Sequence, residues 1–332
     1  MEFLEVKEII NHQPKVFIVT HKNPDGDAMG SSLGLYNYLL KKGASVTVVA
    51  PTDYPVFLDW IEGNNKVKVW GRDDQEIILA AESADLLFCL DFNALHRIDD
   101  VGDLVSKAKG KKVMIDHHQQ PDDFADYMIS DTTACSTAEM VYEFIDQLGD
   151  AELIDRAVGE ALYCGIMTDT GSFRFPSTTS KTHRITADLL DKGVDNSMVH
   201  RRIYDSNTPA RLKLMGHCLL NMEIIEEQHA AYIQISKKDH ARLKIKKGDS
   251  EGIVNFGLSM SNIKCSAFFR EDKDIVKISF RSKDDFNVNE FARKYFNGGG
   301  HINAAGGMSK DSLENTIRTF KKSLIEFIDE KK

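Results

Sequence analysis

The sequence predicts an α/β protein, in which a mostly parallel sheet with helices on both faces precedes a smaller α/β domain with a mixed sheet. In the first half of the chain, short apolar runs rich in β-branched residues alternate with helix-like segments. This alternation is typical of right-handed crossovers between parallel strands. The 332 residues also exceed what one hydrophobic core usually serves. We therefore expect domains at residues 1–191 and 216–332, a helical linker at 192–215, and a cleft between the domains.

The expected elements follow from hydrophobic periodicity and from turn and cap residues. Residues 28–42 have helical periodicity and end at Gly43, where a C-cap glycine belongs. Thr208 is expected to cap a helix at 210–221, with Pro209 in its first turn. Further helices are expected at 180–193 and 288–296. Strands are expected at 16–19, 46–49, 67–70, 86–90 and 113–115 in the first half, and at 222–225, 230–235, 264–270 and 275–281 in the second.

Composition narrows the class of protein. The formal net charge of −9 argues against a protein that wraps long duplex nucleic acid, because such binding needs a basic face, but it allows a small anionic substrate. No stretch approaches the roughly 20 uncharged apolar residues of a membrane helix, and the first ten residues do not resemble a secretory leader. We expect a cytoplasmic protein without a membrane partner. The five widely spaced cysteines predict buried thiols, so any metal must be bound by histidine and aspartate.

Polar side chains that suit a metal follow several of the apolar runs. In parallel sheets, ligands collect at the carboxyl ends of the strands. Each single donor has an ordinary explanation as a turn or cap; Asp27, for example, could cap the helix that follows it. Their recurrence after separate runs instead favours one site for a hard divalent cation. After the runs come His21, Asp25 and Asp27; Asp91; Asp116, His117 and His118; and, after a later helix-like run, Asp169.

A glycine run, Gly298 to Gly300, follows the last expected strand and helix of the second half. Consecutive glycines allow backbone N–H groups to close on an anion, and the small residues after them allow tight packing. A glycine run considered alone is more often only a loop.

Together these motifs resemble a known family. The pattern His21-x-x-x-Asp25-x-Asp27, then Asp91, Asp116-His117-His118 and Asp169-Thr170-Gly171, resembles the motif set of the DHH phosphoesterases, which include RecJ-type exonucleases and class-II inorganic pyrophosphatases. The run GGGHINAAGG at 298–307 is similar to the GGGH-x-x-A-A-G signature of the DHH-associated domain. Asn297 stands where family members often have a fourth glycine, and Ile302 where they often have proline.

The resemblance implies a role for each motif residue. His21, Asp25 and Asp91 would hold one Mn²⁺, and Asp27, Asp91, His117 and Asp169 a second, with Asp91 bridging and with Mg²⁺ or Co²⁺ as alternative metals. Two such ions activate a shared water for attack on a phosphoryl group. The expected catalytic residues are Asp116, which would orient a ligand histidine, and His118, which would face the substrate phosphate.

The second domain would supply substrate contacts opposite the metals. The segment SFRS at 279–282 resembles the strand that provides the substrate arginine in the DHH-associated domain. Arg270 is a further candidate, with a solvated strand end as the equal alternative. The implied substrate-binding residues are Arg281, Ser282, Gly298, Gly299, Gly300 and His301.

Family resemblance alone leaves the substrate open. A short acidic chain with only the two core domains most resembles the nanoRNase and pAp phosphatase branch. That branch implies Mn²⁺-dependent degradation of short oligoribonucleotides (nanoRNA) to mononucleotides, and dephosphorylation of 3′-phosphoadenosine 5′-phosphate (pAp) to AMP. The alternatives are a soluble phosphodiesterase of cyclic dinucleotides or pApA, and a non-catalytic binding module. The family-like oligomer is a homodimer through the first domain.

Overall fold

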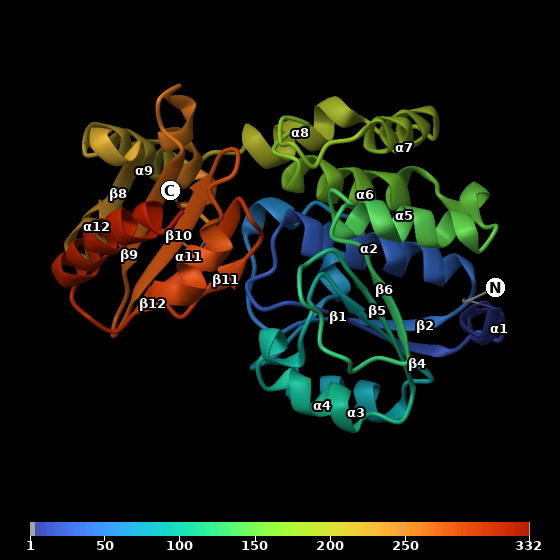
Figure 1. Cartoon of the computed structure of the whole chain (residues 1–332). Helices are drawn as coiled ribbons and strands as arrows, with labels where there is room; N and C mark the ends of the chain where they lie inside the picture. The colour runs from blue at the N-terminus through green and yellow to red at the C-terminus, as the bar shows by residue number, and fades with distance from the viewer. Residues whose placement is uncertain (1–3, 247, 332) are drawn as a thin grey trace. The chain divides into compact units, whose positions relative to one another are not determined.

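Two six-stranded sheets organise the chain (Figure 1). The computed structural model describes residues 4–246 and 248–331, and the chain divides at Ser206/Asn207 into two units. Sheet A belongs to the first unit (unit 1) and sheet B to the second (unit 2). The division lies inside the segment expected to be the linker, and that segment contains helix α8 (Asn196–Tyr204).

Sheet A is entirely parallel, with strand order β3-β2-β1-β4-β5-β6. This confirms the expected α/β fold with a parallel sheet. Strand β6, which lies at one edge of the sheet, was not among the expected strands. The strands are β1 (Lys15–Thr20), β2 (Ser45–Ala50), β3 (Lys68–Val69), β4 (Leu86–Leu90), β5 (Lys111–Asp116) and β6 (Tyr127–Ser130).

Helices cover both faces of sheet A, as Figure 1 shows. Successive residues of a strand point to opposite faces. In β1, Val16 and Ile18 therefore enter one hydrophobic core and Phe17 and Val19 the other. On the first face lie α2 (Gly26–Lys41), α5 (Thr137–Gln147) and α6 (Arg156–Asp169); on the second lie α3 (Asp74–Ser83) and α4 (Val101–Lys107). The other helices of unit 1 are α1 (Leu4–Asn11), α7 (Ser180–Asp191) and α8.

Helices α2 and α6 cross at very short range because glycines face the contact. A Cβ added at Gly30 would lie 2.5 Å from the carbonyl oxygen of Ala161, and one at Gly165 would lie 2.8 Å from Oδ1 of Asp27. Real Cβ atoms do not approach other atoms so closely, so the crossing requires glycine at both positions. The crossing brings Asp27 in α2 and Asp169 at the end of α6 to the same place.

Unit 2 contains a mixed sheet, as expected, with order β11-β12-β10-β9-β8-β7. Among the described strands of this sheet, β8 and β9 pair in parallel and the other neighbours pair antiparallel. Phe269, Phe280, Phe291 and Phe320 form an aromatic core on one face, under α11 and α12. The strands are β7 (Glu223–Ile225), β8 (Ala230–Ile235), β9 (Cys265–Glu271), β10 (Val276–Ser282), β11 (Gly299–Gly300) and β12 (Ala304–Ser309). The helices are α9 (Pro209–Leu220), α10 (Lys237–Leu243), α11 (Val288–Tyr295) and α12 (Leu313–Asp329).

The structure confirms one helix cap expected from the sequence and shows that another is wrong. The Thr208 side chain accepts from the amide of Arg211 and Pro209 begins α9, as predicted. The alternative explanation of Asp27 as a helix cap is wrong. Asp25 caps α2 by accepting from the amides of Asp27 and Ala28. In the ranges 4–246 and 248–331, none of the helices has both the length and the apolar character of a membrane span.

Candidate metal centre and active site

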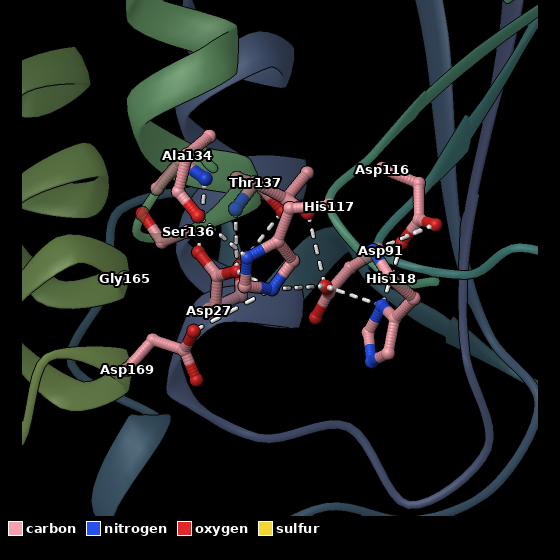
Figure 2. Close-up of polar contacts among 12 residues, drawn as sticks. Asp27, Asp91, Asp116, His117, His118, Ala134, Ser136, Thr137, Gly165 and Asp169 are labelled. Atoms are coloured by element: carbon pink, nitrogen blue, oxygen red, sulfur yellow. Dashed lines mark hydrogen bonds and ion pairs between the residues drawn. The ribbon is translucent and has the colours of Figure 1, made fainter. Parts of the chain in front are cut away.

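The predicted metal-type residues converge at the carboxyl edge of sheet A. Strand β1 lies between β2 and β4, so the chain order reverses there, and ligand sites of α/β proteins lie at such points. His21 follows β1, Asp91 follows β4, and Asp116 ends β5. Helices α2 and α6 bring Asp27 and Asp169 to this edge (Figure 2).

A first group consists of His21, Asp25 and Asp91, which offer ligand atoms within 4.8 Å of one another. Nε2 of His21 lies 3.3 Å from Oδ2 of Asp91. The Nδ1 of His21 donates to the carbonyl oxygen of Lys22 at 2.8 Å, which fixes the ring with Nε2 toward the carboxylates. Such an arrangement is common for histidines that bind metals.

A second group consists of Asp27, His117 and Asp169, again within 4.8 Å. Nε2 of His117 lies 3.5 Å from Oδ2 of Asp169 and 3.8 Å from Oδ2 of Asp27. It also lies 3.7 Å from Oδ1 of Asp91. Asp91 therefore faces the first group with one oxygen and the second group with the other. This is the arrangement that a bridging carboxylate requires.

The third group links Asp91 to the pair Asp116 and His118. Nδ1 of His118 lies 2.6 Å from Oδ1 of Asp116, and the His118 amide donates to Oδ2 of the same carboxylate at 3.0 Å. The histidine that Asp116 holds is therefore His118, and the expectation that Asp116 orients a metal-ligand histidine stays a prediction. The neighbouring His117 is oriented by the carbonyl oxygen of Ala134, 3.2 Å from its Nδ1.

Asp91 has an unusual backbone conformation. Its φ of 63° lies in the left-handed region, which aspartate tolerates better than most residues. Its amide still donates to the carbonyl oxygen of Ile115, so the residue remains tied to the sheet. Backbone strain of this kind often accompanies functional sites. Here it turns the side chain into the cluster directly after the last residue of β4.

The charges of the cluster suit a divalent cation. Burial, with the nearby carboxylates of Asp91, Asp169 and Asp25, raises the pKa of Asp27 well above its ordinary value. Burial alone would also raise the pKa of Asp91, but His21 and the other two histidines outweigh it and hold that pKa below its usual range. Carboxylates buried this close together need positive charge, and carboxylate and imidazole donors suit Mn²⁺ or Mg²⁺. The residues present therefore fit a divalent metal site.

The pKa values of Asp116 and His118 are shifted in opposite directions. Burial and the charge of Asp91 raise the pKa of Asp116 to about 6. Burial and the nearby Arg97 hold the pKa of His118 well below its ordinary value. An imidazole that is neutral at pH 7 beside a carboxyl group can accept or pass a proton.

Three residues around this cluster were not predicted from the sequence. The amides of Thr137 and Ala138 and the hydroxyl of Thr137 contact the carboxylates, and Arg97 lies near His118. The segment Ser136-Thr137-Ala138-Glu139 has the S-x-x-E spacing that marks a helix start. That spacing predicts the start of α5 but gives no sign of what its first turn contacts.

The substrate residues expected in unit 2 lie around the ends of β10 and β11. Nη1 of Arg281 donates to the carbonyl oxygen of Phe280 at 2.9 Å. The hydroxyl of Ser282 donates to the carbonyl oxygen of Phe286 at 2.6 Å. The further candidate, Arg270, donates to Ser250 at 3.3 Å.

Two amides of the glycine run donate within unit 2. The amide of Gly298 donates to the carbonyl oxygen of Ala292, and that of Gly300 donates to Oδ1 of Asn289. The amide of His301 donates to the carbonyl oxygen of Ala304 at 2.7 Å. A Cβ at Gly298 would overlap the carbonyl oxygen of Gly306. The glycines therefore serve the close pairing of β11 with β12, and Asn289 is a partner that sequence reasoning missed.

The fold and this cluster define a class of protein. Residues 15–166 match the DHH family, N-terminal domain, and residues 229–330 match the DHHA1 domain. The chain belongs to the DHH family of phosphoesterases, which are hydrolases acting on phosphoester bonds.

Curated relatives and a solved structure extend the similarity over most of the chain. The bifunctional oligoribonuclease and PAP phosphatase NrnA of Bacillus subtilis (strain 168) is 30% identical over 91% of each chain. The protein of that name from Thermus thermophilus is 31% identical, covering 89% of this chain and 84% of the relative. The crystal structure of an exopolyphosphatase-related protein from Bacteroides fragilis superposes with a TM-score of 0.93 and 38% identity, covering 97% of this chain and 95% of that chain.

Proposed function

We propose that this chain is a Mn²⁺-dependent phosphoesterase that degrades short oligoribonucleotides to mononucleotides and dephosphorylates pAp to AMP. The observation that carries the proposal is the buried cluster at the carboxyl edge of sheet A, where Asp91 belongs to two ligand groups. The choice of substrate is supported by relatives, named for both activities, that align with nearly the whole chain.

In this proposal the two groups hold two divalent ions. His21, Asp25 and Asp91 form one set, and Asp27, Asp91, His117 and Asp169 form the other. When bound, such an ion pair lowers the pKa of a shared water and neutralises the charge that develops on the phosphoryl oxygens. The protein's contribution is to hold the carboxylates in place, with His21 and His117 fixed by backbone carbonyls.

His118 is proposed to face the phosphate and Asp116 to hold it there. The 2.6 Å contact between Nδ1 of His118 and Oδ1 of Asp116 fixes the orientation of the imidazole ring. A neutral imidazole in that position can donate a proton to, or accept one from, a phosphate ester oxygen, depending on which nitrogen carries the proton.

In unit 2, Arg281, Ser282, the Gly298 to Gly300 loop and His301 are proposed to bind the non-scissile phosphate or terminal nucleotide. The proposal depends mainly on Arg281, whose guanidinium is permanently charged, and on the imidazole of His301. Arginine is well suited to phosphate, since its planar guanidinium presents paired donors.

The proposal also includes a cytoplasmic location and a homodimer through unit 1. All five cysteines are free and buried, the form that thiols keep in a reducing compartment.

Product analysis tests the function directly. Metal-free protein would be supplied with Mn²⁺ and given end-labelled oligoribonucleotides of about two to seven residues, pAp, pApA and a cyclic dinucleotide. Mononucleotide release from the short oligomers and AMP formation from pAp are expected, and the Asp91→Ala variant should show neither, which controls for contaminating nucleases. Faster turnover of the cyclic substrate or pApA would favour the cyclic-dinucleotide alternative, and no hydrolysis with any metal would favour a binding module.

A further inference from the structure

The first turn of α5 contacts two carboxylates of the metal cluster at once. The backbone amides of Thr137 and Ala138 donate to Oδ2 and Oδ1 of Asp27, at 2.7 and 2.9 Å. The hydroxyl of Thr137 donates to Oδ1 of Asp91 at 2.9 Å. Figure 2 shows this turn beside Asp27 and Asp91. Three donors from one helix start therefore hold carboxylates from α2 and from the end of β4.

These donors are available because of how α5 begins. Ser136 is the N-cap in an extended conformation, and its hydroxyl oxygen accepts from the amide of Glu139. The amides of the first helical residues have no partner inside a helix, and the helix dipole favours negative charge near them. Asp27 accepts from two of these amides, while the side chain of Thr137 remains free to reach Asp91.

All three side chains are removed from water. Thr137 is fully buried, and Asp27 and Asp91 are exposed by only 1% and 2%. Solvent therefore does not compete with the Thr137 hydroxyl for Asp91 in the folded protein, and the hydrogen bond acts in a medium of low dielectric constant. A charged acceptor makes it stronger than a bond between neutral groups.

We propose that Thr137 is a positioning residue, an inference that rests on the proposed metal site. Its hydroxyl fixes the rotation of the Asp91 carboxylate, so that the two carboxylate oxygens face the two ions. With Oδ1 held by Thr137 on the side of His117, Oδ2 points to His21 at 3.3 Å. Without the hydroxyl, the carboxylate is free to turn toward His118, whose Nδ1 lies 3.7 Å from the same Oδ1. The two groups would then no longer share Asp91 in the required orientation.

The expected consequence is weaker metal binding, with the backbone contacts to Asp27 left intact. Loss of a group that orients a metal ligand typically costs 10- to 100-fold in metal affinity. Thr137→Val removes the hydroxyl at nearly constant volume and should weaken Mn²⁺ binding by about that factor. Thr137→Ser retains the hydroxyl and should bind Mn²⁺ almost as the wild type does.

The test measures Mn²⁺ binding to metal-free protein without substrate, by titration calorimetry and by the electron paramagnetic resonance signal of coupled manganese ions. The matched control is Thr186→Val, because the hydroxyl of Thr186 donates to the carbonyl oxygen of Thr182 within α7. The control should bind both ions as the wild type does. If Thr137→Val does not fold, Thr137→Ala removes the same hydroxyl without adding a methyl group in its place.

The possible outcomes distinguish a failure of the role of Thr137 from a failure of the metal site. Weakened binding and loss of the coupled signal in Thr137→Val, with rescue in Thr137→Ser, would support the role of Thr137. Wild-type affinity and coupling in the valine or alanine variant, or equal losses in the serine and valine variants, would overturn it while leaving the metal site intact. A wild-type chain that binds no divalent ion would instead overturn the proposed function, and the role of Thr137 with it.

Discussion

The candidate residues are arranged differently at the strand ends of the two sheets. In the parallel sheet A, every strand ends at the same edge, so side chains that follow β1, β4 and β5 meet although they are far apart in sequence. In the mixed sheet B, neighbouring strands mostly run in opposite directions, and the candidate residues sit on one strand end and one glycine-rich pair. A parallel sheet therefore concentrates charged groups in one place, whereas the mixed sheet offers a rigid apolar support for a few contacts.

The two units also differ in the sign of their net charge. Acidic residues outnumber basic ones up to Ser206, and basic residues outnumber acidic ones from Asn207 onward. An acidic unit with buried carboxylates suits cations, and a basic unit suits phosphates. The predictions below test whether metal chemistry belongs to unit 1 and substrate contacts to unit 2.

The largest effect is expected for Asp91→Ala. Losing the carboxylate shared by two ligand groups should lower kcat/KM by roughly a thousandfold or more, because metal ions supply several kcal/mol of charge stabilisation. Kinetics and metal analysis would check this, with Asp146→Ala, an exposed carboxylate on α5, as the control. A variant with both ions bound and nearly normal turnover would disprove the assignment of Asp91.

His118→Ala should separate phosphate contact from metal binding. We expect turnover to fall by roughly 10²- to 10⁴-fold, as for a residue in proton transfer, while both metal ions remain bound. Metal content by elemental analysis and single-turnover rates give the two readouts. His12→Ala, at an exposed histidine of unit 1, is the control. Loss of metal together with activity would make His118 a metal ligand instead.

Arg281→Ala tests whether unit 2 contributes to substrate binding. Loss of a charge-assisted contact worth about 1.5–3 kcal/mol should reduce kcat/KM for pAp and dinucleotides by roughly 10- to 150-fold. Bis-p-nitrophenyl phosphate has no terminal nucleotide to hold, so its hydrolysis should be spared. Arg318→Ala, on the exposed surface of α12, serves as the control. Equal losses on all substrates would mean that Arg281 supports the fold or the metals.

Gly298→Ala should damage unit 2 without touching the metal site. The added Cβ would overlap the carbonyl oxygen of Gly306, and overpacking of this kind costs roughly 1–3 kcal/mol of stability. Gly216→Ala, in helix α9 with open space around it, should stabilise by about 1 kcal/mol at most. Denaturant titration followed by Mn²⁺ binding measures both effects. A Gly298→Ala chain of normal stability but poor substrate binding would show that the glycine loop contacts the substrate and does more than pack against β12.

The smallest effect concerns pH and Asp150. Burial alone would raise the pKa of Asp150, but hydrogen bonds from Tyr38 (2.5 Å) and Lys42 (3.0 Å) outweigh it and hold that pKa below its ordinary value. The lowered pKa stabilises the folded state above the unfolded pKa of about 3.9, and this contribution disappears as pH falls through the lower folded value. Asp150→Asn should therefore lose about 1 kcal/mol near pH 7.

The loss in Asp150→Asn should shrink as the pH falls below about 4, where the wild-type carboxylate also becomes neutral. Urea unfolding of both proteins at several pH values gives the comparison, with the exposed Asp146→Asn as the control. A difference that does not change with pH would show that Asp150 acts by shape and not by charge.

The sequence by itself determined the parallel fold and most of the candidate cluster. The apolar runs followed by His21, Asp91 and Asp116 are enough to predict that these side chains meet, because the carboxyl ends of parallel strands must share one edge. The cap at Thr208 and Pro209 could also be predicted, since it depends only on neighbouring residues. These features follow from local chemistry and from the direction of the strands.

Only the tertiary structure decided how the cluster is held. The Thr137 amide reaches Asp27 across 110 residues, and its hydroxyl reaches Asp91 across 46. The left-handed conformation of Asp91 and the space that Gly165 leaves for Asp27 depend equally on distant contacts. Such contacts arise when helices and strands pack, and no local pattern in the sequence records which buried donor will meet which carboxylate.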